Sequence, residues 1–218
     1  MAEPSSETIT QKPRIPMLKH APQTTEETRR SLKWRVVDIA VGAAVGVMSG
    51  VMFWVFDGMS YGLFPLLTLI LPGSAALLHA LFYFPAPLVL LIVRNPGASA
   101  YVLLFASFVE VVLGTKYSVS LVVIALVQAL AAETVFALFR YRRWTLGITL
   151  LAALAVGIVY NFYLLFFYYQ AFSFFSPRGL IGTACELLSA AVFAGFGSWG
   201  LYRALAKSGV LARFSSGQ

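Results

Sequence analysis

KWRVVDIAVGAAVGVMSGVMFWVFDG, residues Lys33–Gly58, is the stretch that decides the fold of this chain. It opens with two basic residues around a tryptophan and closes on the aromatic side chains Trp54 and Phe56. The roughly 20 residues between these ends carry one charge, Asp38, and match a hydrocarbon core about 30 Å thick. Basic and aromatic residues of this kind mark the two interfaces of a bilayer. The stretch therefore predicts a transmembrane helix.

Small residues recur four apart along this helix. Ala40 and Ala44 form one row, and Gly42, Gly46 and Gly50 form a second. Lipid provides no hydrophobic drive between helices, so rows of small residues are what allow another helix to approach closely. We therefore expect these rows to contact a partner subunit, and we name Ala40, Gly42, Ala44 and Gly46 as its candidate interface.

Composition places the whole chain in the membrane. Of the 218 residues, 59% are hydrophobic and only 11% are charged, whereas a soluble domain carries about 25% charged residues. We expect a disordered cytoplasmic tail over residues 1–32, a transmembrane domain over 33–206 and a cytoplasmic C-terminal tail over 207–218. The polar N-terminus has no apolar core typical of a secretory signal. A single cysteine, Cys185, excludes an internal disulfide.

Apolar sequence continues after the first helix as far as Val93, too long for one span and too short for two. We expect an apolar outer loop over Gly58–Pro72, folded over the outer mouth, and a second span over Gly73–Val93, disturbed at Pro85. Irregular backbone at that depth requires a cavity or protein around it. Four further spans are expected at about 98–113, 118–139, 145–171 and 179–201.

Basic residues set the orientation of these spans. Of the 16 Lys and Arg, only Lys116 and Arg178 fall in the expected outer segments, and none falls within a span. Cytoplasmic segments are enriched in Lys and Arg, so we predict an all-α integral membrane protein with six transmembrane helices and both termini inside. The basic residues behind the net charge of +7 then lie beside the lipid bilayer and set the orientation of the spans. They do not form a nucleic-acid-binding surface.

Two carboxylates in the expected outer leaflet are the main candidates for ligand binding. Glu110 and Glu186 have no basic residue in their own spans, and an ionisable group within a membrane costs a few kcal/mol to place there. They predict a pocket for a cationic ligand. The alternative is that they snorkel to the interface or pair with Lys116 and Arg178.

Aromatic and polar side chains gather in the same region and complete the predicted substrate-binding set. A cationic heteroaromatic ligand gains about 0.5–2 kcal/mol from each stacking or cation–π contact. Two members have simpler alternatives, because Asn161 could bind a neighbouring helix and His79 could be a packing residue. The candidates besides the two carboxylates are Trp54, Tyr117, Tyr160, Asn161, Tyr163 and His79.

Two carboxylates lie nearer the expected inner interface. Asp38 is three residues from Arg35, which favours a local ion pair or a role at the helix N-terminus. For Glu133 a structural and a functional role are equally open.

Two motifs of common enzymes are missing. The sequence contains no G-x-x-x-x-G-K-[ST] phosphate loop and no H-E-x-x-H. We therefore expect no catalytic residues, no metal site and no cofactor, and a subunit that depends on a partner to supply energy. The halves also show no inverted repeat, which counts against a self-sufficient secondary transporter.

Four separated motifs carry a family resemblance across residues 33–215. They are WRVVDI at 34–39, RNPGA at 94–98, QALAAE at 128–133 running into FALFRYRRW at 136–144, and GVLARF at 209–214. Together they resemble the YkoE family of substrate-binding (S) components of energy-coupling factor (ECF) transporters, a form of ABC transporter. The N-terminal tail lies outside the resemblance.

The resemblance implies a six-helix subunit of the bacterial cell membrane that captures thiamine or its hydroxymethylpyrimidine precursor from outside. It also implies a transmembrane T component and two ATPase subunits as partners, dedicated or shared. The residues alone leave two other functions open, a stand-alone ion-coupled transporter and a membrane scaffold that transports nothing. No ligand residue is transferred from the family, so the candidate site depends on depth and chemistry.

Overall fold

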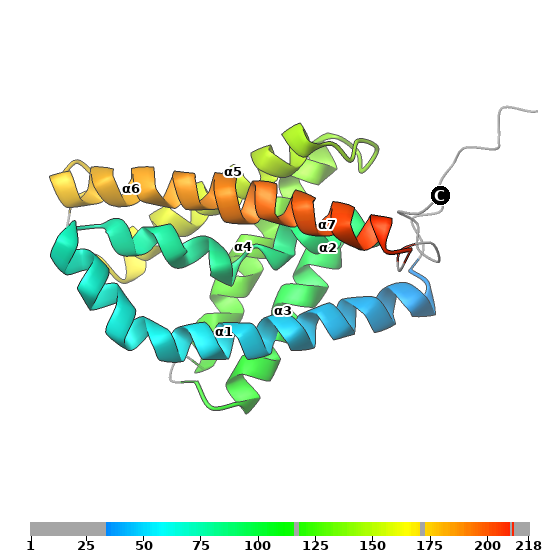
Figure 1. Cartoon of the computed structure of the whole chain (residues 1–218), viewed down its shortest axis with the longest axis horizontal. Coiled ribbons are helices and arrows are strands. Elements are labelled where there is room, and N and C mark those ends of the chain that lie inside the picture. The colour runs from blue at the N-terminus through cyan, green and yellow to red at the C-terminus, as the bar shows by residue number, and fades with distance from the viewer. Residues whose placement is uncertain (1–33, 116–117, 171–172, 210, 212–218) are drawn as a thin grey trace, which may run out of the picture. The chain divides into compact units, whose positions relative to one another are not determined.

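The computed structural model describes residues 34–115, 118–170, 173–209 and 211, within which every regular element is helical. The predicted all-α class is confirmed. In chain order the elements are α1 (Val36–Ile70), the 3₁₀ helix η1 (Ser74–Phe82), α2 (Pro85–Val93), α3 (Ala98–Val112), α4 (Ser118–Leu138), α5 (Leu146–Phe167), α6 (Pro177–Ser189), the π-helical segment η2 (Ala190–Gly197) and α7 (Ser198–Lys207). In Figure 1, α1 and the α6–α7 segment run lengthwise, whereas α3 and α4 run steeply across them.

The apolar helices agree with a multi-pass membrane protein. Within the described residues, five stretches are long and apolar enough to cross a bilayer, and α3 is apolar but shorter. The expected six crossings and their orientation stay predictions. The limits of the two tails also stay predictions, because most residues of both tails lie outside the described part of the chain. The five stretches are Val36–Ile70, Ser74–Val93, Ser120–Leu138, Leu146–Phe167 and Pro177–Lys207.

The expected apolar loop over Gly58–Pro72 is wrong. This segment continues α1, which runs unbroken as 35 residues to Ile70 with Pro65 inside it. A helix satisfies its own backbone N–H and C=O groups, whereas an apolar loop beside lipid would leave them unpaired. Figure 1 shows α1 changing direction in its C-terminal third, the part that contains this proline, a residue that kinks helices.

The second span is divided, as its prolines predict. The 3₁₀ helix η1 ends before Pro85, and α2 begins at that proline, because the first position of a helix needs no N–H donor. Gly73 precedes η1 with a φ of 97°, and a Cβ there would lie 2.7 Å from the backbone nitrogen of Gly182 on α6. A glycine is therefore required where η1 begins against α6.

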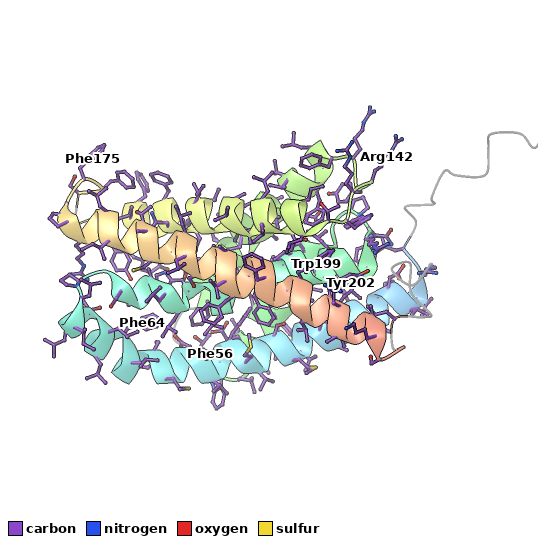
Figure 2. The ribbon with its side chains drawn as sticks, turned by 45° about the horizontal axis from the view of Figure 1, so that its top comes forward. Phe56, Phe64, Arg142, Phe175, Trp199 and Tyr202 are labelled. Carbon is purple, nitrogen blue, oxygen red and sulfur yellow. The ribbon has the colours of Figure 1, made fainter. Side chains whose placement is uncertain are left out.

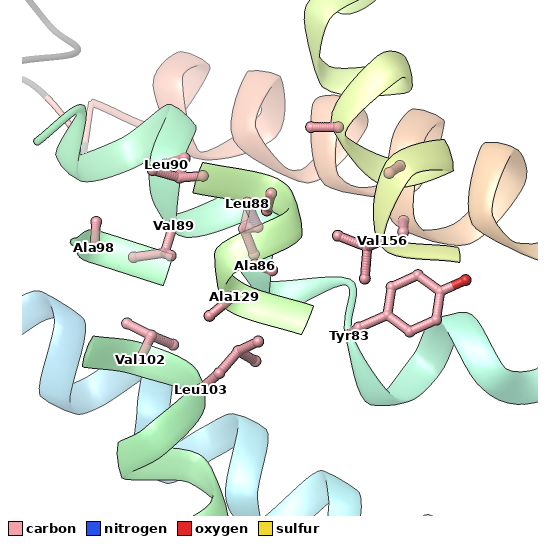
Figure 3. Packing of buried hydrophobic residues seen from close by; sticks show 14 of the residues in the cluster. Tyr83, Ala86, Leu88, Val89, Leu90, Ala98, Val102, Leu103, Ala129 and Val156 are labelled. Atoms are coloured by element: carbon pink, nitrogen blue, oxygen red, sulfur yellow. The ribbon is translucent and has the colours of Figure 1, made fainter. Parts of the chain in front are cut away.

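Helix α2 forms the centre of the buried core. All nine of its residues are buried, and it packs against α3, α4, α5 and α7. In Figure 3, Ala86 and Val89 of α2 lie among Leu103, Ala129 and Val156 of the surrounding helices. Alanines without exposed surface allow this close approach, which is the main source of cohesion between helices in lipid.

The glycine row of α1 packs within the chain. A Cβ at Gly42 would lie 2.7 Å from the ring of Tyr101, and a Cβ at Gly46 would lie 2.8 Å from the ring of Phe105, both on α3. This corrects the expectation that Gly42 and Gly46 contact a partner subunit, because α3 of the same chain already occupies that face.

The alanine row lies on a different face of the same helix. Ala40 and Ala44 are exposed, and Met48, one turn further along, is 75% exposed. Their assignment to a partner interface stays a prediction.

Candidate ligand-binding site

A cavity of about 290 Å³ lies among α1, η1, α3, α4 and α5. This volume is near the lower end of the roughly 300–1,000 Å³ typical of small-molecule sites. Aromatic side chains from α1, η1 and α5 form much of its wall, among them Phe53, Phe64, Phe82 and Tyr160. We call this space the first cavity.

Two carboxylates face the first cavity from neighbouring helices. Glu110 on α3 is 2% exposed, and Asp57 on α1 is 9% exposed. Thr115 donates a hydrogen bond of 3.4 Å to Asp57, whereas no described residue donates one to the carboxylate of Glu110. Among the described residues that line the cavity there is no Lys or Arg. Two buried carboxylates that face an aromatic cavity favour a positively charged ligand.

Gln128 adds an unsatisfied amide to the wall. It lies on α4, is 2% exposed, and its Nε2 has no hydrogen-bond partner in the described part of the chain. A buried donor left unpaired costs about 1–3 kcal/mol. A ligand atom with a lone pair, placed in the cavity, would satisfy this donor.

Aromatic rings form a connected wall around the cavity. The rings of Phe53 and Phe82 are 6.0 Å apart, and that of His79 lies 5.8 Å from Phe64 and 5.5 Å from Tyr160. A wall of aromatic rings suits a flat aromatic ligand.

The cavity lies toward one end of the helices. In Figure 2, Phe64 lies toward the same end of the helices as Phe175, and Arg142 and Tyr202 lie toward the other end.

A second cavity of about 330 Å³ adjoins the first. Phe64, His79 and Tyr169 border both spaces. Asn161 and the half-buried Arg178 line the second cavity. His79 therefore stands where the two cavities meet.

Glu186 lies behind the wall rather than in it. Its carboxylate is fully buried, its Oε2 is 2.5 Å from Nδ1 of His79, and its Oε1 accepts a 2.7 Å hydrogen bond from the hydroxyl of Tyr83. The expected alternatives, a free ligand carboxylate or a partner of Lys116 or Arg178, are both replaced by this network within the described chain.

Three comparisons with known proteins bear on this site. A family model described as the permease component of an ABC-type cobalt transport system matches residues 37–159, more than half of the chain. The chain belongs to this family. A crystal structure of an S component of an ECF transporter aligns with a TM-score of 0.76 at 26% identity, covering 85% of this chain and 92% of that one.

A curated relative is similar over most of both chains. The chain is 25% identical over 189 residues to YkoE of Bacillus subtilis (strain 168), which is described as a candidate HMP/thiamine permease protein. The alignment covers 85% of this chain and 91% of the relative. The resemblance drawn from the four sequence motifs is thereby confirmed, and the protein is an S component of the ECF type.

In this S component, four of the candidate residues border a cavity. Glu110 and Tyr160 line the first cavity, Asn161 lines the second, and His79 lines both. Asn161 also donates to the hydroxyl of Thr183 at 2.9 Å, which confirms that it binds a neighbouring helix.

Three further candidates lie elsewhere or cannot be placed. Trp54 is 43% exposed and borders neither cavity. Tyr163 packs its ring 4.7 Å from that of Phe167 and also borders neither. Tyr117 lies outside the described residues.

Sequence reasoning missed Asp57 and Gln128 as members of the site. The first span was expected to end at Gly58, next to Asp57, so this carboxylate was not expected in the site. Its signal was the apolar sequence after it, which continues α1 and places Asp57 inside the membrane protein. Gln128 opens the QALAAE motif, and its position within an apolar span was the available signal.

Asp38 has a structural role at the other end of α1. Arg35 forms an ion pair of 3.4 Å with it, and Asn95 donates a hydrogen bond of 3.2 Å. The local ion pair expected from the sequence is confirmed.

Glu133 is likewise engaged within the fold. It accepts hydrogen bonds from the backbone N–H of Ser99 at 2.9 Å and from the hydroxyl of Tyr141 at 2.5 Å. Burial, followed by the hydrogen bond to Glu133, raises the pKa of Tyr141, which lies in the turn after α4. Of the two roles left open for Glu133, the structure favours the structural one.

Proposed function

We propose that this S component captures thiamine, or its hydroxymethylpyrimidine precursor, in the first cavity and delivers it to an ECF transporter. The single observation that carries the proposal is the pair of buried carboxylates, Glu110 and Asp57, which face a cavity lined by aromatic rings. The name of the Bacillus subtilis relative supports the same class of ligand.

The chemistry of thiamine suits this cavity better than that of its precursor. Thiamine is a cation with two aromatic rings, so the carboxylates offset its charge and the rings of Phe53, Phe82 and Tyr160 stack against it. Hydroxymethylpyrimidine carries no permanent charge, and the carboxylates would give it only hydrogen bonds. Both ligands offer a lone pair to the unsatisfied amide of Gln128.

The proposed complex contains a transmembrane T component and ATPase subunits, which hydrolyse ATP while this chain binds the vitamin. Ala40 and Ala44 support that assembly, because they present a small-residue row on an exposed face of α1. We further propose six crossings of the bacterial plasma membrane with both termini in the cytoplasm. The positions of Arg142 and Arg203, exposed near helix ends, agree with this orientation.

Calorimetric titration of the detergent-solubilised full chain tests the ligand. We expect saturable thiamine binding, weakened about tenfold or more by Glu110→Gln because a charge-assisted contact contributes about 1.5–3 kcal/mol. Glu133→Gln is the matched control, since it makes the same chemical change at a carboxylate outside both cavities. Equal affinity of wild type and E110Q for thiamine would remove the cavity assignment.

Two other outcomes would replace the proposal. Absence of thiamine and hydroxymethylpyrimidine binding, with saturable binding of Co²⁺, would favour the metal named in the family description. Thiamine uptake into vesicles that contain only this chain, driven by a pH gradient, would favour a stand-alone transporter.

A further inference from the structure

Glu186 and Ser189 of α6 form hydrogen bonds with η1 and with the residue that follows it. They are three residues apart, so both side chains lie on the face of α6 that packs against η1. Ser189 accepts a hydrogen bond from the N–H of Ala80 at 3.2 Å and donates one to the carbonyl of Leu77 at 2.7 Å. Glu186 instead contacts two side chains, those of His79 and Tyr83. It can therefore orient a side chain that borders the cavities.

His79 is the side chain that connects Glu186 to the cavities. It is 5% exposed, and its Nδ1 lies 2.5 Å from Oε2 of Glu186. Its Nε2 has no partner among the described residues, and the ring borders both cavities. The ring centroids of Phe64 and Tyr160 lie 5.8 and 5.5 Å from the centroid of the imidazole. Nε2 is therefore the polar atom of His79 that a ligand can reach.

The buried position of Glu186 decides which protons this pair carries. A charged carboxylate without exposed surface is costly even with the hydroxyl donor of Tyr83, and one proton shared with His79 makes the pair neutral overall. The neutral pair exists as imidazolium with carboxylate or as imidazole with carboxylic acid. In both forms Nε2 carries a hydrogen. The carboxylates of Asp57 and Glu110, which line the first cavity with His79, favour the same protonated nitrogen.

We infer that Glu186 is a positioning residue, which orients His79 so that its Nε2–H donates a hydrogen bond to the bound ligand. The inference rests on the proposed function. It adds which kind of ligand atom faces His79. The atom that faces His79 is an acceptor with an in-plane lone pair, such as a pyrimidine ring nitrogen. Tyr83 supports the arrangement, because its hydroxyl occupies the other oxygen of Glu186 at 2.7 Å.

Nitrogen NMR can observe His79 directly, because the chain contains only two histidines, His20 and His79. In the full chain with His20→Gln and ¹⁵N-labelled histidine, every histidine signal comes from His79. We expect Nε2 to carry a hydrogen without ligand, and its resonance to shift when thiamine saturates the protein. A purely structural His79 would show no such shift.

Replacing Glu186 tests the positioning role. In Glu186→Gln the amide cannot share the proton, so we expect part of the Nε2 population to lose its hydrogen. We also expect thiamine affinity to fall about tenfold, the effect of losing one hydrogen bond of about 1.4 kcal/mol. Ser189→Ala is the matched control, because it removes a side-chain contact between α6 and η1 but leaves the Glu186–His79 pair intact. We expect it to keep the wild-type Nε2 signal and affinity.

The outcomes separate this inference from the proposed function. An unprotonated Nε2 in the ligand-free protein overturns the inference, and so does thiamine saturation that leaves the Nε2 resonance unchanged. In both cases measured thiamine binding would leave the proposed function standing. If neither thiamine nor hydroxymethylpyrimidine binds, the proposed function fails, while the ligand-free spectrum still decides the proton position on His79.

Discussion

Gly50 of α1 lies so close to Ala106 of α3 that a Cβ added to the glycine would be 2.5 Å from the alanine carbonyl oxygen. The obstacle is backbone, which cannot rotate away as a side chain can. The separation of α1 and α3 therefore depends on a missing methyl group. Asp57 and Glu110 lie further along these two helices, so the same contact helps to set the distance across the first cavity.

Gly50→Ala is expected to destabilise the fold. The added methyl group must push α1 away from α3, and overpacking of this kind costs about 1–3 kcal/mol. The thermal unfolding midpoint in detergent measures the loss. Ala44→Val adds a larger side chain at an exposed position of the same helix, so it should leave the midpoint nearly unchanged. A midpoint of G50A equal to wild type would show that α1 and α3 separate freely.

Ala40→Trp is expected to leave folding and thiamine binding intact and to abolish ATP-driven uptake. Ala40 is exposed on α1 and touches neither cavity, so a large side chain there blocks only the approach of another helix. Uptake into vesicles reconstituted with the T component and ATPases measures the effect. Phe108→Trp, at a 62% exposed position of α3, is the control. Normal uptake by A40W would show that the partner binds another face.

Asp57→Asn should weaken thiamine binding more than hydroxymethylpyrimidine binding. The substitution keeps the shape of the side chain and removes its charge, and only thiamine carries a permanent positive charge. We expect the ratio of the two dissociation constants to change about tenfold, since charged hydrogen bonds contribute about 1.5–3 kcal/mol. Parallel titrations measure the ratio. An equal loss for both ligands would indicate that Asp57 acts by hydrogen bonding or folding alone.

Tyr160 and Tyr163 form a matched pair on α5, because only Tyr160 lines the first cavity. Tyr160→Leu should therefore weaken thiamine binding about two- to twelvefold, as expected for loss of an aromatic contact of about 0.5–1.5 kcal/mol. Tyr163→Leu should leave affinity unchanged. Calorimetry on both variants is the test, and equal effects would place the ligand elsewhere along α5.

Tyr141→Phe should lower stability by about 1–3 kcal/mol, because Glu133 loses the hydroxyl donor of its buried carboxylate. The folded protein raises the pKa of Tyr141 above its ordinary value of 10.0. The contribution of this residue is therefore complete below about pH 10 and is lost as the pH rises above that value. Unfolding midpoints between pH 8 and 11 should fall less steeply in Y141F than in wild type, and parallel slopes would contradict the assignment.

Several local features were predictable because they depend on neighbours in the sequence. The break before Pro85 follows from the missing proline N–H, and the ion pair of Asp38 with Arg35 follows from their spacing on one helix. Glu110, Tyr160 and His79 were found as candidates because polar groups at that depth need partners. The helical course of residues 58–70 was missed, because proline and glycine in an apolar segment suggested a loop.

The sequence by itself determined a multi-pass, all-helical membrane protein. The hydropathy of each segment decides whether it can lie in lipid, and a segment in lipid must be a helix to satisfy its own backbone hydrogen bonds. Only the tertiary structure decided which polar side chains face the cavity. That choice depends on the rotation of each helix about its axis, which contacts such as Gly50 with Ala106 set. The same contacts turned Asp57 and Gln128 inward and placed Glu186 behind His79.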